Sequence, residues 1–224
     1  MPARIIPLAT NEIFHVLNRG TGSIPIFKTQ YDYQKFIELM LFYQNSEIPV
    51  RYSKFLSLTI DIRNQILKEF AKNKKHLIEI IAYCLMPTHF HLLLRQLMEN
   101  GIEKFSRKIS DSYSHYFNIK TERKGGLFEG RFQATRITSD QQLLHVSRYI
   151  HLNPYSSFLV KDFVALEKYP YSSFPEYINN SPVSRCQKEI VLNQFKKPED
   201  YKDFVYDQAD YQKTLDQIKH QTFE

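Results

Sequence analysis

Two histidines at strand spacing are the first residues that could carry chemistry. His89 and His91 lie two positions apart in an apolar run, and residues two apart on a β-strand point to the same face. Two imidazoles within reach of one point form part of a metal site. The pair alone does not establish such a site, because this spacing also arises by chance in a chain with 8 histidines.

A tyrosine and an asparagine four residues apart form the second group. Tyr149 and Asn153 lie one turn from each other on a predicted helix, with His145 one turn earlier. A phenol, with a free pKa near 10, attacks phosphorus when a base or a positive charge helps remove its proton. The Asn153 amide oxygen could complete a metal shell begun by the two histidines. The alternative is that Tyr149 packs in the core and Asn153 only caps the helix.

Such a shell of nitrogen and oxygen ligands favours particular metals. Imidazole nitrogens with an amide oxygen and open positions suit Mg²⁺ or Mn²⁺ better than a structural Zn²⁺. The residues therefore favour a divalent-metal site beside a tyrosine nucleophile.

The strands that must position these residues follow from hydrophobic patterning. Residues 12–17 alternate, with Ile13, His15 and Leu17 on one face, and a turn is expected from Asn18 onward. Residues 77–85 and 89–94 are strand-length apolar runs joined by Met86-Pro87-Thr88, which predicts an antiparallel hairpin. Residues 127–137 read as a further extended segment with a basic edge.

Helical periodicity alternates with these strands. It predicts helices at 31–43, around 60–70 and at 102–119. A last helix begins after a capping box at Ser139 and is expected to stop at Asn153, because Pro154 disfavours helix in the residue before it. This order predicts an α+β fold with helices on one face of an antiparallel sheet. An amphipathic tail follows from Lys188.

Charge and composition restrict the class of protein. The 224 residues carry 30 Lys and Arg against 24 Asp and Glu, a net charge of +6. Residues 187–224 carry −2, so the basic charge belongs to the main body. Residues 120–136 combine five basic residues with two phenylalanines, a mixture that suits a nucleic acid or an ordinary solvated loop.

No apolar run approaches the roughly 20 residues that a membrane span needs. Two cysteines and an N-terminus without the layout of a signal peptide predict a cytoplasmic, reduced protein.

Several ordered blocks together resemble the REP-associated tyrosine transposases. These are single-tyrosine HUH nucleases, relatives of the insertion sequence 200/605 transposases. The resemblance covers almost the whole chain. The blocks are FHVLNRG (14–20), MPTHFHLLL (86–94), YSHYFN (113–118), GLFEGRF (126–132), RYIHLNP (148–154), YPYSS (169–173) and IKH (218–220).

The resemblance implies a fold, a site and an activity. It implies a ferredoxin-like or RRM-like antiparallel sheet with helices packed on it, the HUH nuclease domain at 1–160, and a loop and helical extension at 161–224. His89, His91 and Asn153 match the metal ligands, with Mg²⁺ or Mn²⁺ as the ion, and Tyr149 matches the nucleophile. The implied activity is cleavage and joining of single-stranded DNA beside a hairpin, through a 5′-phosphotyrosine, at the nucleoid of a bacterial cell.

Contacts to DNA are expected in the basic, aromatic segment. Glu129 stands where many relatives carry glutamine, which could weaken a phosphate contact. The candidate DNA-binding residues are Arg123, Lys124, Arg131, Arg136, Phe128 and Phe132.

Other interpretations stay open at this point. The chain could be a domesticated DNA- or RNA-binding protein that no longer cleaves, or a phosphoesterase that uses water as its nucleophile. Tyr113 and Tyr116 are rival nucleophiles, but neither has Asn or Gln four residues later. The long tail favours a monomer over a dimer.

Overall fold

A four-stranded antiparallel sheet forms the centre of the computed structural model, which describes residues 7–179 and 184–214. The strand order β2-β3-β1-β4 is that of a ferredoxin-like β-α-β-β-α-β unit. The predicted α+β class and ferredoxin-like sheet are therefore confirmed. The block at 218–220 lies outside the described residues. The strands are β1 (Ile13–Arg19), β2 (Ile78–Met86), β3 (His89–Gln96) and β4 (Gln133–Ile137).

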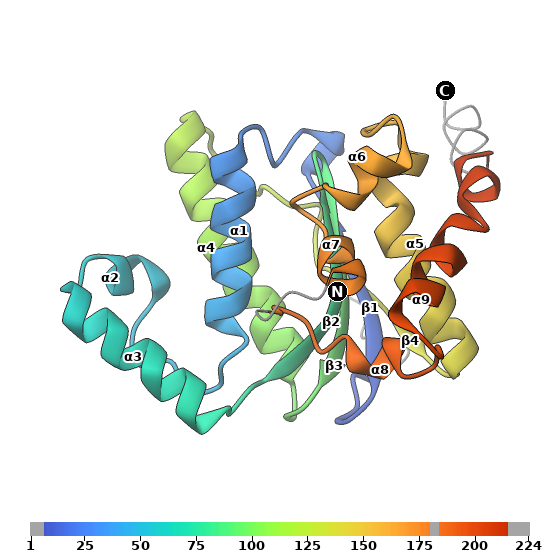
Figure 1. The fold of residues 1–224 in the computed structure, drawn as a ribbon. Helices are drawn as coiled ribbons and strands as arrows, with labels where there is room; N and C mark the ends of the chain where they lie inside the picture. Colours follow the sequence, from blue (N-terminus) through green and yellow to red (C-terminus); the bar gives the residue numbers. More distant parts are fainter. Residues whose placement is uncertain (1–6, 180–183, 215–224) are drawn as a thin grey trace.

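Two helices cover one face of this sheet (Figure 1). They are α1 (Gln30–Tyr43) and α4 (Gly101–Thr121). The apolar residues of α4, Phe105, Ile109 and Phe117 among them, recur at helical spacing and are buried. The spacing that predicted an amphipathic helix at 102–119 therefore sets which side of α4 meets the sheet.

The opposite face is covered by α5 (Asp140–Ser156), which packs on β2 and β3. Figure 1 shows the sheet between the α1–α4 layer and α5. The expectation of helices on one face was therefore wrong. The apolar run of β2 explains the difference, because an unbroken apolar strand is typical of one buried on both sides.

Three predicted boundaries also differ. Helix α5 runs to Ser156 with Pro154 inside its last turn, where the Pro154 carbonyl accepts a bond from the amide of Val160. Strand β1 includes Asn18 and Arg19, because both pair with β3. Strand β4 is shorter than the predicted 127–137, since Gly130 has a φ of 67° and breaks the extended segment.

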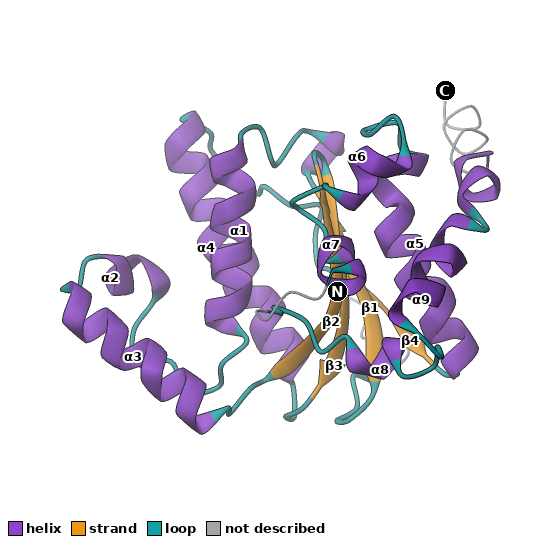
Figure 2. Ribbon diagram, viewed as in Figure 1, coloured by secondary structure: helices purple, strands orange, loops and turns teal. Residues whose placement is uncertain are grey.

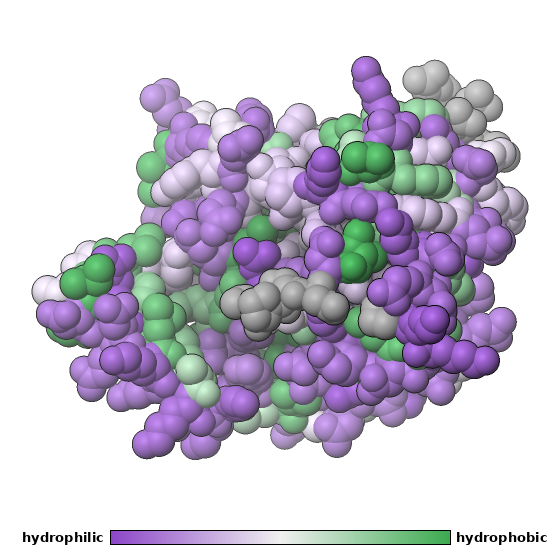
Figure 3. Space-filling view, viewed as in Figure 1, coloured by the Kyte–Doolittle hydropathy of each residue, from purple (hydrophilic) through white to green (hydrophobic). Residues whose placement is uncertain are grey.

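A lobe formed by residues 44–75 lies beside α1, away from the sheet (Figure 2). It contains α2 (Tyr52–Leu56) and α3 (Ile60–Asn73). Phe42 of α1 contacts the rings of Phe55 and Phe70 at 5.0 and 5.6 Å. Hydrophobic residues remain exposed on the lobe, and Figure 3 shows hydrophobic colour there on a largely polar face.

The segment after α5 covers the outer edge of β2. Backbone bonds join Leu85 to Tyr171 and Tyr83 to Ser173 at 2.9 Å each, and a covered edge strand is protected from pairing with other chains. No helix in the described ranges is long and apolar enough to cross a bilayer. The remaining helices are η1 (Thr21–Ser23), α6 (Phe163–Glu167), α7 (Phe174–Ile178), α8 (Glu189–Leu192) and α9 (Pro198–Tyr206).

His151 joins α5 to this C-terminal segment. Its Nδ1 lies 2.6 Å from the Tyr201 hydroxyl and its Nε2 lies 2.8 Å from Ser173 Oγ. The ring is completely buried, and burial lowers the pKa of His151 to about 3. The folded protein therefore holds a neutral imidazole here.

Acid is expected to destabilise the fold through this residue. An unfolded histidine has a pKa of about 6.5, whereas folded His151 has a pKa of about 3. Between these two pH values the histidine is protonated in the unfolded chain and neutral in the folded protein. The free energy of unfolding should fall as the pH drops through this range, with His15, whose pKa is about 4, adding to the effect. Urea unfolding at pH 7 and pH 5 measures it.

The variant His151→Gln keeps an amide donor and acceptor but does not titrate. Between pH 7 and pH 5 the free energy of unfolding of this variant should fall less than that of the wild type, by up to about 1.4 kcal/mol per pH unit. His115→Gln, at an exposed position, serves as the control. An acid dependence equal to that of the wild type in His151→Gln would contradict the assignment.

Candidate active site

The two histidines of β3 lie on the face of the sheet that α5 covers. His89 begins the strand and His91 follows two residues later. Their ring centroids are 5.0 Å apart at 90°. Only 5% of His91 is exposed, so its polar ring is enclosed in the interior.

Helix α5 brings Tyr149 to this pair. The helix starts where Ser139 Oγ accepts a bond from the Gln142 amide at 3.1 Å, as the capping box predicted. Three turns later the Tyr149 ring lies 5.4 Å from His91, edge to face. Residues separated by almost 60 positions in the chain thus meet at one point.

Asn153 lies one turn beyond Tyr149 and is buried. Its Nδ2 donates to the Tyr149 carbonyl at 2.9 Å, which leaves the amide oxygen Oδ1 as the atom able to act as a metal ligand. The cap interpretation is wrong, because α5 continues past Asn153 to Ser156.

A third histidine, which was not among the predicted site residues, contacts this group. His15 of β1 stacks on His91 with ring centroids 5.1 Å apart, and its Nε2 lies 2.9 Å from His91 Nδ1. Burial lowers the pKa of His15 to about 4, so the ring is neutral at pH 7. The available signal was a polar residue between Ile13 and Leu17 on an otherwise apolar strand face.

Hydrogen bonds occupy the Nδ1 atom of each histidine of the pair. Thr88 Oγ1 lies 3.0 Å from His89 Nδ1. His15 Nε2 lies 2.9 Å from His91 Nδ1. In the tautomer in which Nδ1 carries the proton and donates, Nε2 holds the lone pair that can bind a metal. The histidines therefore fit a divalent ion. The described residues hold no cluster of three His, Cys, Asp or Glu side chains suited to a metal, and the Asn153 amide oxygen would be the further ligand beside the two histidines.

Arg19 is a second residue absent from the predictions. It pairs with His89 across β1 and β3, and directly paired residues share a face of the sheet. The side chain is half exposed and forms an ion pair of 3.4 Å with Glu129. The acid at position 129 therefore contacts a cation at the rim of the histidine site.

The predicted DNA-binding residues divide into two groups. Lys124 and Arg131 are exposed in the loop between α4 and β4, and that loop meets β1 through the bond from the Glu129 amide to the Arg19 carbonyl. Arg123 belongs to the same loop and donates to the Gly126 carbonyl at 2.7 Å.

The other three residues lie elsewhere. Arg136 pairs with Glu12 at 2.6 Å and faces the α1–α4 side, since its partner across the strands is Phe14. Phe128 is half-buried against Phe90, at 5.9 Å. Phe132 is also partly buried against the core. The structure does not bring Arg136 and Phe128 to the histidine face.

The rival tyrosines lie across the sheet from the histidines. The Tyr113 hydroxyl donates to the Ile26 carbonyl at 2.6 Å, and the Tyr116 hydroxyl donates to Asp32 at 2.6 Å. Burial raises the pKa of both phenols. His145 does not join the site either, because its Nδ1 lies 2.7 Å from Arg148. Tyr149 is the tyrosine beside the histidines.

Comparisons with known proteins agree with the blocks in the sequence. Residues 51–153 match the family described as transposase IS200 like. A Haemophilus influenzae protein described as a REP-associated tyrosine transposase is 28% identical over 130 residues, which are 53% of this chain and 72% of that protein.

A solved structure shares the fold. It is described as a REP-associated tyrosine transposase bound to a REP hairpin, with a TM-score of 0.53 and 18% identity over 83% of this chain and 89% of the other. The matched segment 51–153 contains the histidine pair, Tyr149 and Asn153. The resemblance found in the sequence is confirmed: residues 51–153 are similar to the IS200-like transposases, and the chain is similar to a REP-associated tyrosine transposase.

Proposed function

We propose that this protein cleaves and rejoins single-stranded DNA beside a hairpin, with Tyr149 as the nucleophile. The observation that supports this most is the Tyr149 ring 5.4 Å from His91, within one chain. A phenol next to a divalent-metal site is what transfer of a phosphodiester to the protein requires. The matched family and the similar proteins point to the same chemistry.

In the proposed reaction the bond energy of the phosphodiester is kept. Tyr149 Oη loses its proton and attacks the phosphorus, the P–O3′ bond breaks, and the departing O3′ takes up a proton. The products are a 5′-phosphotyrosine and a 3′-hydroxyl. The reverse attack by a 3′-hydroxyl rejoins DNA and releases Tyr149, so no nucleotide cofactor is consumed.

His89, His91 and Asn153 would hold Mg²⁺ or Mn²⁺, which when bound withdraws charge from a phosphate oxygen. The chain supplies the positioning. His15 orients the His91 ring, and α5 holds the phenol against it. Arg19 is paired with His89, and Lys124 and Arg131 are exposed in the loop that bonds to the Arg19 carbonyl through the Glu129 amide. These three cations would contact phosphates.

We propose a monomer that is active with its own tyrosine, because α5, which carries Tyr149, packs on β2 and is bonded to the C-terminal segment of the same chain through His151. Its substrate would be REP-like hairpin DNA, and such a protein would act at the nucleoid in the bacterial cytoplasm.

The first test is a covalent adduct. Purified protein is incubated with end-labelled hairpin DNA from the flanks of its own gene and Mn²⁺ or Mg²⁺, then separated on a denaturing gel. We expect labelled protein that disappears in Tyr149→Phe, because phenylalanine has no nucleophilic oxygen. Tyr155→Phe, on the same helix, is the matched control and should retain the adduct.

Two results would contradict this function. Specific binding without an adduct, across metals and flanking sequences, would favour a domesticated binding protein. Cleaved DNA with no adduct, in both the wild type and Tyr149→Phe, would favour hydrolysis by water.

The second test addresses the metal ligands. His89→Ala and Asn153→Ala should slow metal-dependent cleavage by roughly 10²–10³-fold, the cost of losing one electrostatic contact to a transition state. DNA binding, measured by fluorescence anisotropy without metal, should persist. Unchanged cleavage rates in both variants would remove the metal-site assignment.

The third test addresses His15. In His15→Phe an aromatic ring remains but the hydrogen bond to His91 Nδ1 is lost, so Mn²⁺ affinity should fall by roughly 10–100-fold. His15→Gln offers an acceptor oxygen and should recover part of the loss. Titration of free Mn²⁺ by electron paramagnetic resonance measures both, and equal affinity of His15→Phe and the wild type would show that His15 does not position the ligand.

A further inference from the structure

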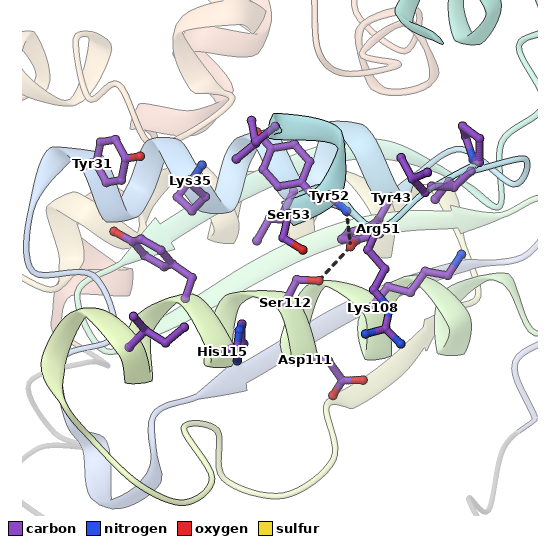
Figure 4. Close-up of a pocket in the computed structure, with 17 residues that line it drawn as sticks. Tyr31, Lys35, Tyr43, Arg51, Tyr52, Ser53, Lys108, Asp111, Ser112 and His115 are labelled. Carbon is purple, nitrogen blue, oxygen red and sulfur yellow. Dashed lines mark hydrogen bonds between the residues drawn. The ribbon is translucent and has the colours of Figure 1, made fainter. Parts of the chain in front are cut away.

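A second hollow lies on the other side of the sheet from Tyr149. It is a pocket of about 900 Å³ between α1 and α4, closed at one end by α2 and the loop before it (Figure 4). Its volume is in the range of ligand sites, roughly 300–1,000 Å³. Tyr31, Lys35, Arg51 and Lys108 are among its lining residues.

Hydrogen bonds join the three walls of this pocket. The Tyr43 hydroxyl on α1 lies 2.9 Å from Ser112 Oγ on α4, and it accepts a bond of 3.2 Å from the backbone amide of Tyr52 on α2. Figure 4 shows this chain of bonds across the pocket. The walls are therefore held at a set separation, and the pocket is formed before any ligand binds.

Positive charge exceeds negative charge in the pocket, because Lys35, Arg51 and Lys108 line it against one acid, Asp111. Lys35 pairs with Glu38 at 3.1 Å, but within the described ranges no acid lies in ion-pair contact with Arg51 or Lys108. Burial, together with Arg107 and Lys104 nearby, lowers the pKa of Lys108. An anion bound here would relieve this repulsion, whereas an apolar partner would bury unpaired cations at a cost.

A stacking surface lies at the other end. Tyr31 is 61% exposed, and its ring centroid is 6.0 Å from that of Tyr116. Lys35 Nζ lies 5.5 Å from the same ring. An exposed aromatic ring beside cations is the combination that binds unpaired bases, with stacking on the ring and phosphates on the basic groups.

We propose that this pocket binds unpaired nucleotides of single-stranded DNA. Tyr31 would stack on a base, and Arg51 and Lys108 would contact the phosphates that follow it. The inference rests on the proposed function for the identity of the ligand, and it adds a second contact on the opposite side of the protein from the cleavage site. DNA held there would be anchored independently of the strand at Tyr149.

The test measures binding without cleavage. All proteins carry Tyr149→Phe, and the probe is a fluorescent oligothymidine of 12 nucleotides, which forms no hairpin. Arg51→Ala combined with Lys108→Ala should weaken binding roughly 10-fold at low salt and lower the slope of log affinity against log salt by about 1–2. Tyr31→Ala should weaken it at least roughly 5-fold.

Matched controls remove the same groups elsewhere. Lys68→Ala combined with Lys72→Ala takes two charges from the exposed surface of α3, and Tyr211→Ala removes a ring that is 63% exposed. Both should bind nearly as the Tyr149→Phe parent does. Photocrosslinking with 5-iododeoxyuridine in the probe should label peptides containing Tyr31 or Tyr116.

Three outcomes would overturn the inference: unchanged affinity in the pocket variants, losses of equal size in the controls, or crosslinks restricted to α5 and β3. Binding of polyglutamate but not of the oligonucleotide would also overturn it, in favour of an acidic protein partner. These results are distinct from the adduct assay, since failure of adduct formation with wild-type protein removes the cleavage function and leaves the binding measurements standing.

Discussion

The structure depends on a central strand that is buried on both faces and carries histidines on one of them. Phe90, Leu92 and Leu94 fill the α1–α4 side of β3, and His91 is enclosed on the other side. A polar ring in the interior needs hydrogen-bond partners. His15 supplies one at 2.9 Å, so the neighbouring strand β1 is part of the site as well as of the sheet.

Helix α5 contacts the histidines on one side and the C-terminal segment on another. One side presents Tyr149 to the histidines, and the other binds the C-terminal segment through His151 and Arg148. The Arg148 guanidinium stacks 4.2 Å from the Phe204 ring and donates to the Phe204 carbonyl. The helix is therefore held between the sheet and the C-terminal segment. This packing fixes the position of Tyr149.

The sheet and its helices also separate two surfaces that differ in character. On the histidine face His91 is enclosed, and Arg19 lies beside His89 at the start of β3, where the loop after α4 bonds to the Arg19 carbonyl. The outer side of α1 and α4 is a broad pocket shaped by the 44–75 lobe. The lobe packs on α1 through aromatic rings, so a segment outside the sheet forms part of a surface that the central sheet alone would lack.

Local patterns in the sequence determined the β2–β3 hairpin, the amphipathic α4, and the placement of Tyr149 and Asn153 one turn apart, because strand and helix periodicities are properties of neighbouring residues. The blocks around these residues also carried the resemblance to the REP-associated tyrosine transposases. Only the tertiary structure decided that His15 meets His91 across 76 positions, that Arg19 lies beside His89, and that α5 covers the second face. Those contacts depend on the register between distant strands, and register is set by how the whole core packs, which no local pattern contains.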